Sequence, residues 1–180
     1  MPTFKSIKEM QAYLKKSINT SLVEDVAPIV KETMSAEIQN SVYTEYPNPH
    51  MYKRRLDEGG LIDERNMNID ESLISSGILS ITNNTPFDDR YDTFNTGNGL
   101  AGLIEFGDGY KGNYYDYTNY DGDNSYKEPR PFIENSRETL RQTKVHVKAL
   151  KKGLRESGIK VETENATLSA TWNVCSIVAI

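Results

Sequence analysis

Apolar residues recur at helical spacing through the first forty residues of the chain. One stripe runs through residues 7–18 and a second continues through residues 22–38. This periodicity is typical of an amphipathic helix that packs against a core, and it predicts a helical region over residues 6–40. The apolar positions are Ile7, Met10, Leu14, Ile18, Leu22, Val26, Ile29, Val30, Met34 and Ile38.

Two sequence signals bear on where this helical region begins and whether it is continuous. Ser6 stands three residues before a glutamate, which is the spacing of a capping box, and Ser21 repeats the pattern. Pro28 cannot donate to the helix ladder and clashes with the preceding turn. The sequence therefore predicts either one long kinked helix or two helices broken near residues 19–24.

A second amphipathic helix is predicted over residues 132–157. Pro131 suits the first turn of a helix, and Gly158 suits the left-handed position just past its end. One apolar stripe faces the core, and we expect four of its side chains to be buried there. Those four are Leu140, Val147, Leu150 and Leu154, with Ile133 also on the stripe.

Three regions alternate apolar and polar residues in the manner of β-strands. They are residues 42–46, residues 77–83 and a hairpin within residues 159–174. Residues 100–106 fit either a short helix closed by Gly107 or a buried strand.

These elements predict an α+β fold in which long N-terminal and C-terminal helices pack on a small, mainly antiparallel sheet. We assign residues 1–158 to one domain. Residues 159–180 would form a C-terminal β extension, either part of the same core or an arm to a neighbouring subunit, because their last six positions are mostly apolar.

Composition narrows the classes of function. The 180-residue chain carries a net charge of −5, which argues against general nucleic-acid binding as its main task. No stretch approaches the roughly 20 apolar residues of a membrane span, and residues 1–20 lack the pattern of a secretory signal. The single cysteine, Cys175, fits a reducing cytoplasm.

Tyrosine and aspartate crowd residues 107–128. A connection of this length without secondary structure is uncommon in a compact domain, and tyrosine is enriched in protein interfaces. We therefore interpret this segment as an interface loop, with a disordered tip and a sugar-binding or catalytic loop as the alternatives. Its six tyrosines are Tyr110, Tyr114, Tyr115, Tyr117, Tyr120 and Tyr126.

Charge is segregated along the sequence. Residues 88–128 hold nine acidic and three basic residues, whereas residues 134–160 hold eight basic and three acidic ones. Either both are solvated surfaces, or the acidic loop of one copy meets the basic helix of the next, as in head-to-tail rings. The basic residues assigned to such an interface are Arg141, Lys148, Lys151 and Lys152.

The sequence offers no recognisable set of catalytic or metal-binding residues. His50 and His146 are the two histidines, and neither has the signature of a nucleophile–base pair or a zinc site. A partial match to a calcium loop begins at Asp121 but lacks the required glycine and glutamate. We expect no cofactor and no enzymatic activity. The alternative is a cell-wall sugar hydrolase, with Glu105 and a loop aspartate as its acid and base, or a carbohydrate-binding module.

Several motifs in fixed order resemble a known family. LIEFG (103–107) is followed, after the loop, by PRPF (129–132) and a basic helix, and YPNPHMYKRR (46–55) and GGLID (59–63) precede them. Together, over roughly residues 42–158, these segments resemble the tail-completion proteins of long-tailed bacteriophages. Such proteins are also called head–tail joining or neck proteins. The loop after Gly107 is longer and richer in tyrosine than the family pattern.

The resemblance implies a structural virion protein of the phage neck without catalysis. Copies would form a ring, a hexamer or dodecamer, that joins the head connector to the tail. The implied partners are head connector or stopper proteins and tail tube or terminator proteins, with non-specific proximity to DNA in the channel and no membrane. The protein would reside in the virion after assembly in the cytoplasm of the host bacterium.

Overall fold

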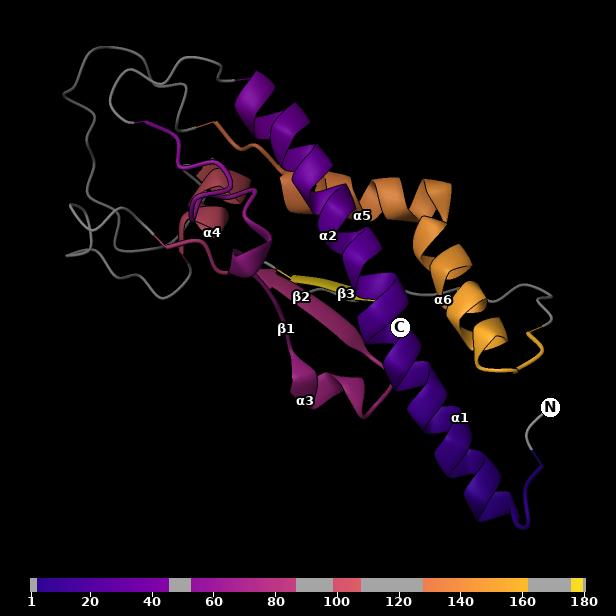
Figure 1. Cartoon of the computed structure of the whole chain (residues 1–180). Helices are drawn as coiled ribbons and strands as arrows, with labels where there is room; N and C mark the ends of the chain where they lie inside the picture. The colour runs from indigo at the N-terminus through magenta and orange to yellow at the C-terminus, as the bar shows by residue number, and fades with distance from the viewer. Residues whose placement is uncertain (1–2, 46–52, 87–98, 108–127, 162–175, 180) are drawn as a thin grey trace, which may run out of the picture.

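The protein is built around one long helical rod. The computed structural model describes residues 3–45, 53–86, 99–107, 128–161 and 176–179. The rod consists of α1 (Ile7–Ser21), a π-helical segment (Leu22–Val26), α2 (Ala27–Glu37) and a second π-helical segment (Ile38–Thr44), joined without a break. Figure 1 shows it crossing the whole molecule, with the first turns of α1 projecting past the remaining elements.

The predicted start of this helix is confirmed. Ser6 Oγ accepts a hydrogen bond from the Glu9 N–H at 3.2 Å, and the Glu9 carboxylate accepts from the N–H of Lys5 at 2.8 Å. Ser21 does not begin a second helix. It is the buried last residue of α1, and the rod continues past it into the π-helical segment. The wide π turn directly before Pro28 provides the local adjustment that a proline within a helix requires.

The strand predicted at residues 42–46 is wrong over residues 42–45, and Tyr46 lies outside the described residues. Val42, Tyr43 and Thr44 belong to the second π-helical segment. Val42 stands four residues after the buried Ile38, so the apolar stripe of the helix continues onto it, and Val42 and Tyr43 are buried. Burial of this stripe outweighs the weak strand preference of valine and tyrosine.

A three-stranded antiparallel sheet lies beside the rod. Its order is β1 (Met67–Ile69), β2 (Leu79–Asn83) and β3 (Ser176–Ala179), with Met67 opposite Asn83 and Leu79 opposite Ala179. The strand predicted at residues 77–83 is confirmed as β2. Residues 159–161 are not a strand, and residues 162–174 lie outside the described residues. A short 3-10 turn (Glu64–Asn66) and helix α3 (Glu71–Ile74) flank β1.

The predicted C-terminal helix is two helices. α5 (Phe132–Thr143) ends at Lys144, which has a φ of 54°, and α6 (Val145–Glu156) leaves in a new direction (Figure 1). The ambiguous segment near residue 100 is helix α4 (Gly99–Phe106), followed by Gly107 with a φ of 54°.

α2 and α5 pack side by side over the sheet and enclose the core. Leu140 is buried as predicted, whereas Val147 and Leu154 are only partly buried. Leu150 is also only partly buried, but it packs on the core, and the break at Lys144 rotates α6 so that Val145 and Ala149 pack there beside it. The α+β prediction is confirmed, and the proposed division at residue 158 stays a prediction. No helix in the described part of the chain is long and apolar enough to cross a membrane.

Candidate interaction surface

Helix α6 carries the three lysines that the sequence analysis assigned to an interface. Lys148 and Lys152 are exposed, and Lys151 is partly buried. Lys152 Nζ lies 3.8 Å from Glu156 Oε1, an exposed pair of the kind that contributes little to stability. Two of the three predicted lysines therefore present their charge to solvent.

Helix α1 lies directly beside α6. The Tyr13 hydroxyl donates to the carbonyl oxygen of Ser157, just past the end of α6. At Gly153, α6 and the rod approach so closely that an added Cβ would overlap the carboxylate of Asp25, in the first π-helical segment, and lie 2.5 Å from Ser21 Oγ, at the end of α1. The small residues Ser17, Ser21 and Gly153 are all buried at this crossing.

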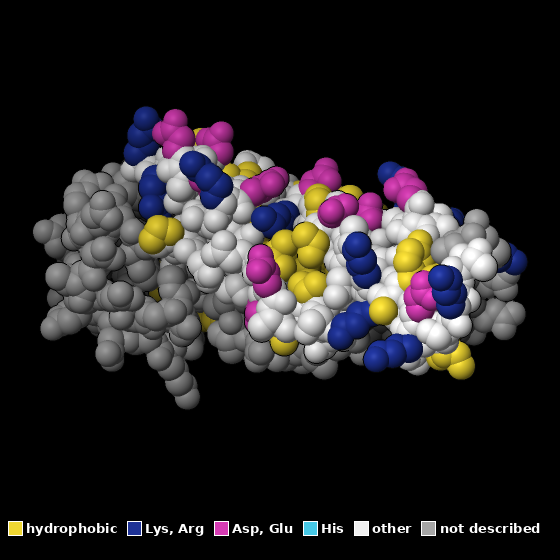
Figure 2. All heavy atoms as spheres, turned by 60° about the horizontal axis from the view of Figure 1, so that its bottom comes forward, with side chains coloured by type: hydrophobic (Ala, Val, Ile, Leu, Met, Phe, Trp, Pro, Cys, Tyr) yellow, Lys and Arg dark blue, Asp and Glu magenta, His cyan; other side chains and the backbone are white. Residues whose placement is uncertain are grey.

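This packing places two basic helices side by side, and we call their combined outer surface the α1–α6 surface. From Lys5 to Ser21 and from Val145 to Glu156 it holds eight basic and two acidic residues, a net of +6 in a chain whose total is −5. Figure 2 shows basic side chains gathered toward this end of the molecule, with apolar ones among them. The basic residues are Lys5, Lys8, Lys15, Lys16, Lys148, Lys151, Lys152 and Arg155.

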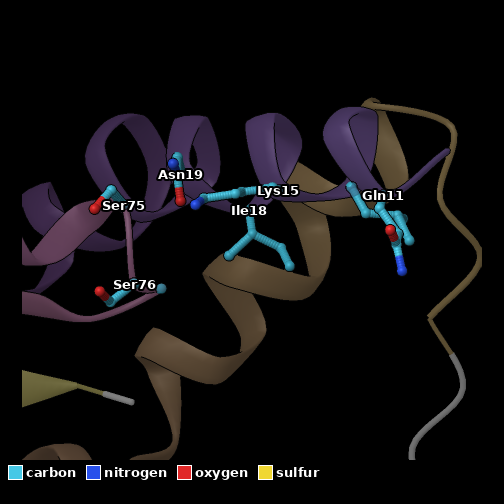
Figure 3. Close-up of a pocket in the computed structure, with 8 residues that line it drawn as sticks. Gln11, Lys15, Ile18, Asn19, Ser75 and Ser76 are labelled. Carbon is cyan, nitrogen blue, oxygen red and sulfur yellow. The ribbon is translucent and has the colours of Figure 1, made fainter. Parts of the chain in front are cut away.

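An open groove of about 410 Å³ runs along α1. One wall is formed by Gln11, Leu14, Lys15, Ile18 and Asn19, and the other by the turn from Ser75 to Gly77. In Figure 3, Ile18 points from α1 into this space, and Ser75 and Ser76 stand on the other side.

The apolar stripe of α1 extends beyond the groove toward the free end of the helix. Ile7 is 72% exposed and Met10 is 38% exposed, although both belong to the face that sequence periodicity assigned to a core. The prediction that this first stripe is buried is therefore wrong for Ile7 and Met10, because the first turns of α1 project past the other described elements.

Arg141 does not belong to the α1–α6 surface. It lies on α5, before the break at Lys144, and its guanidinium pairs with Glu134 at 3.3 Å and Glu138 at 3.5 Å. These exposed pairs partly neutralise it. The structure thus separates Arg141 from the lysines with which the sequence had grouped it.

The six tyrosines of the acidic loop lie outside the described residues, so their assignment to an interface stays a prediction. What the structure does give is where their segment is attached. Its two ends, Gly107 and Glu128, are held close together because the Arg130 N–H donates to Ile104 O at 2.8 Å. The acidic segment therefore leaves and re-enters the fold at one place.

Glu105, the residue that the hydrolase alternative needs, is buried in this joint. Its two carboxylate oxygens accept hydrogen bonds from Ile133 N at 2.9 Å and Glu134 N at 3.1 Å, so it caps the N-terminus of α5. Burial raises the pKa of Glu105 above its ordinary value of 4.5, although the two N–H groups and Arg137 oppose that shift. The carboxylate ties the LIEFG motif to the first turn of α5, directly after the PRPF motif.

The GGLID motif is likewise a structural turn. Asn66 Nδ2 donates to Gly60 O at 2.9 Å, and the buried Asn83 Nδ2 donates to Leu61 O at 2.8 Å. Asp63 accepts from Gly59 N at 2.7 Å and from Arg65, whose guanidinium holds the pKa of that carboxyl well below its usual range. These bonds fix the turn against β1 and β2.

The described residues contain no group of three or more histidine, cysteine, aspartate or glutamate side chains that could hold a metal ion. His146 is partly buried at the start of α6, and desolvation lowers its pKa. The predicted absence of a cofactor stays a prediction.

Sequence reasoning missed the contribution of α1 to the basic surface. The signal was present, because four lysines and one glutamate lie between residues 5 and 21. Finding it required knowing that α1 packs against α6, and that contact depends on small buried side chains which leave no strong pattern.

Comparison with known proteins identifies the family of the chain. The model of the YomN family matches residues 6–156. An SPbeta prophage-derived uncharacterized protein, YomN of Bacillus subtilis (strain 168), is 31% identical over 161 residues, which cover 88% of this chain and 99% of the relative. No solved structure matches. The chain is of phage origin by this relationship, and it belongs to the YomN family.

Proposed function

We propose that this chain is a structural virion protein of the phage neck, where copies form a ring that joins the head connector to the tail. The observation that carries the proposal is the separation of charge on the fold. The α1–α6 surface has a net charge of +6, and the rest of the chain has a net charge of −11. Such an asymmetry favours head-to-tail contact between copies, which closes into a ring when the rotation between neighbours is suitable.

Two further observations support the proposal. The prophage relative places the chain among phage proteins. The two motifs that resemble tail-completion proteins meet in one joint, where Glu105 caps α5 and Arg130 bonds to Ile104. A joint of this kind gives the two motifs a shared structural role, and it leaves the length of the loop between them free because the two ends of the loop lie close together.

Interrupting the gene in a phage that carries it tests the proposal. A stop codon early in the gene should give lysates in which DNA-filled heads and complete tails accumulate separately under negative stain. Purified protein added to the lysate should restore tailed particles, and the protein should be detected in purified virions. Normal tailed particles from the interrupted phage, or protein absent from purified virions, would contradict a neck function.

A further inference from the structure

We propose that the α1 groove and the exposed stripe beside it receive the tyrosine- and aspartate-rich segment, residues 108–127, of a second copy of this chain. The inference rests on the proposed self-assembly and names the two surfaces that meet. It follows from three observations: the chemistry of the groove, the sequence of the segment, and the distance between them on one molecule.

The groove and stripe have an apolar centre with a basic border. Ile7, Leu14 and Ile18 lie along one face of α1, and by helical spacing Lys8 and Lys15 lie along one edge of that face. A partner that fits must supply apolar area together with negative charge. A second copy of α1 does not, because residues 5–21 carry a net charge of +3 and two such helices would repel each other.

Residues 114–123 have the complementary composition. They hold four tyrosines and three aspartates and no basic residue. A tyrosine ring contributes large apolar contact area at low entropic cost and keeps a polar end for water or a side chain. Tyrosines in the groove with aspartates beside Lys8 and Lys15 would satisfy both parts of the surface.

Two hydrogen bonds locate the attachment of this segment on the rod. Thr139 Oγ1 donates to Glu37 at 2.8 Å, and Asn135 Nδ2 donates to Ser41 Oγ at 2.9 Å. α5 therefore runs antiparallel to the rod, and its N-terminus, where residue 128 enters, lies level with Ser41 or beyond it. The segment is attached at the end of the rod opposite the free end of α1, as Figure 1 shows for α4 and α5.

The segment is too short to reach Gln11 and the exposed stripe at the free end of α1 on its own molecule. At a rise of about 1.5 Å per residue, Gln11 lies about 45 Å along the rod from Ser41, and Ile7 lies about 51 Å away. Both ends of the 20-residue segment are fixed near one place, so its tip is about ten residues from an anchor. Ten fully extended residues span at most about 33–36 Å. Contact with this part of α1 therefore requires the segment of another copy.

Site-specific photocrosslinking tests this contact in the full chain. The photoreactive residue p-benzoylphenylalanine replaces Gln11, which is exposed at the groove, in protein made with ordinary nitrogen, and this protein is mixed with ¹⁵N-labelled protein. We expect crosslinked peptides that join residue 11 of one isotope to residues 108–127 of the other. The matched control places the same photoreactive residue at Ala12, which is also exposed but does not line the groove, and should give at least about fivefold less of this product.

A second arm removes apolar contact without touching the core. Ile7→Ser, at a side chain that is 72% exposed, should leave the melting curve unchanged and reduce the residue 11 crosslink severalfold. Crosslinks from residue 11 to α1, to residues 87–98 of another copy, to added duplex DNA, or only within one copy would overturn the assignment. So would an absence of crosslinks in protein that light scattering shows to be oligomeric. If the protein is monomeric at every concentration, the proposed ring itself fails, and this result is distinct from a failure of the groove alone.

Discussion

Glu105 shows how a single residue in this fold can resemble a catalytic group and act as a structural one. Its carboxylate is buried and bonded to two backbone N–H groups of α5. Removing one partner from a buried hydrogen bond leaves the other unsatisfied, at a cost of about 1–3 kcal/mol. The residue therefore belongs to the stability of the α4–α5 joint.

Glu105→Ala should lower the free energy of unfolding by about 1–3 kcal/mol, because two N–H donors at the start of α5 lose their acceptor. Urea denaturation followed by circular dichroism measures this. Glu138→Ala, at an exposed carboxylate of α5, is the control and should change stability by no more than about 0.5 kcal/mol. Equal effects of the two substitutions would show that Glu105 does not cap α5.

The raised pKa of Glu105 predicts a pH dependence of folding. The folded state holds the proton more tightly than the unfolded chain, so this group stabilises the fold below pH 4.5 and loses that contribution as pH rises through its raised pKa. Relative to Glu105→Gln, the wild-type protein should become less stable across this window. A stability difference that is constant with pH in parallel urea titrations would contradict the shift.

At the scale of elements, Lys144 decides the course of the C-terminal third of the described fold. Its positive φ ends α5 and redirects α6 onto α1. A left-handed conformation costs an ordinary residue roughly 1–2 kcal/mol and costs glycine little. Sequence periodicity could not reveal the break, because the apolar positions remain in phase across it and lysine is not a residue that usually marks one.

Substitutions at Lys144 distinguish the break from the continuous helix that the sequence predicts. Lys144→Gly should be neutral or stabilising at the observed φ, whereas it would cost about 1 kcal/mol in an uninterrupted helix. Lys144→Val should destabilise the protein, since a β-branched residue is strongly disfavoured at a positive φ. Thermal melts of the two variants measure these changes in stability. A larger loss of stability in Lys144→Gly than in Lys144→Val would support a single uninterrupted helix.

The same break separates Leu140 from Val147, which the sequence periodicity places on one buried face. Leu140→Ala should cost about 2–5 kcal/mol because its side chain is 4% exposed in the core. Val147→Ala should cost less than about 1 kcal/mol because Val147 is only partly buried and does not belong to the core cluster. Denaturant melts that show equal losses would place Val147 in the core after all.

Much of the fold was predictable from local patterns, and the errors have specific causes. The Ser6 cap and strand β2 were visible because their residues have strong local preferences. Residues 100–106 left a short helix and a buried strand open, because a segment of seven residues shows too few turns to fix its period. Residues 42–46 were misread because burial beside Ile38 outweighed their β propensity. Strand β1 was missed because three residues cannot establish an alternation. For the site, the lysines of α6 were predictable. That α6 packs beside the basic helix α1 was not, because this contact depends on tertiary packing at Gly153.

At the scale of the whole molecule, the fold separates charge more sharply than the sequence does. The rod places the attachment of the acidic, tyrosine-rich segment at one end and the α1–α6 surface at the other. Exposed ion pairs contribute only about 0–1 kcal/mol each, and salt screens them. In such an assembly, tyrosines would supply most of the affinity, and charge would set orientation and rate.

The molar mass of the protein in solution, followed by light scattering against concentration and salt, tests the central claim that copies associate through these two surfaces. We expect a ring-sized multiple of the 20.4 kDa chain, and loss of association when Tyr114, Tyr115 and Tyr117 are changed to serine in a protein that still folds. Lys148→Glu with Lys152→Glu should weaken association about 5–30-fold at low salt and less at 1 M salt. The charge-matched pair Lys31→Glu with Lys53→Glu, away from the α1–α6 surface, should have little effect. A protein that remains monomeric at all concentrations, or a tyrosine variant that assembles like the wild type, would contradict this account.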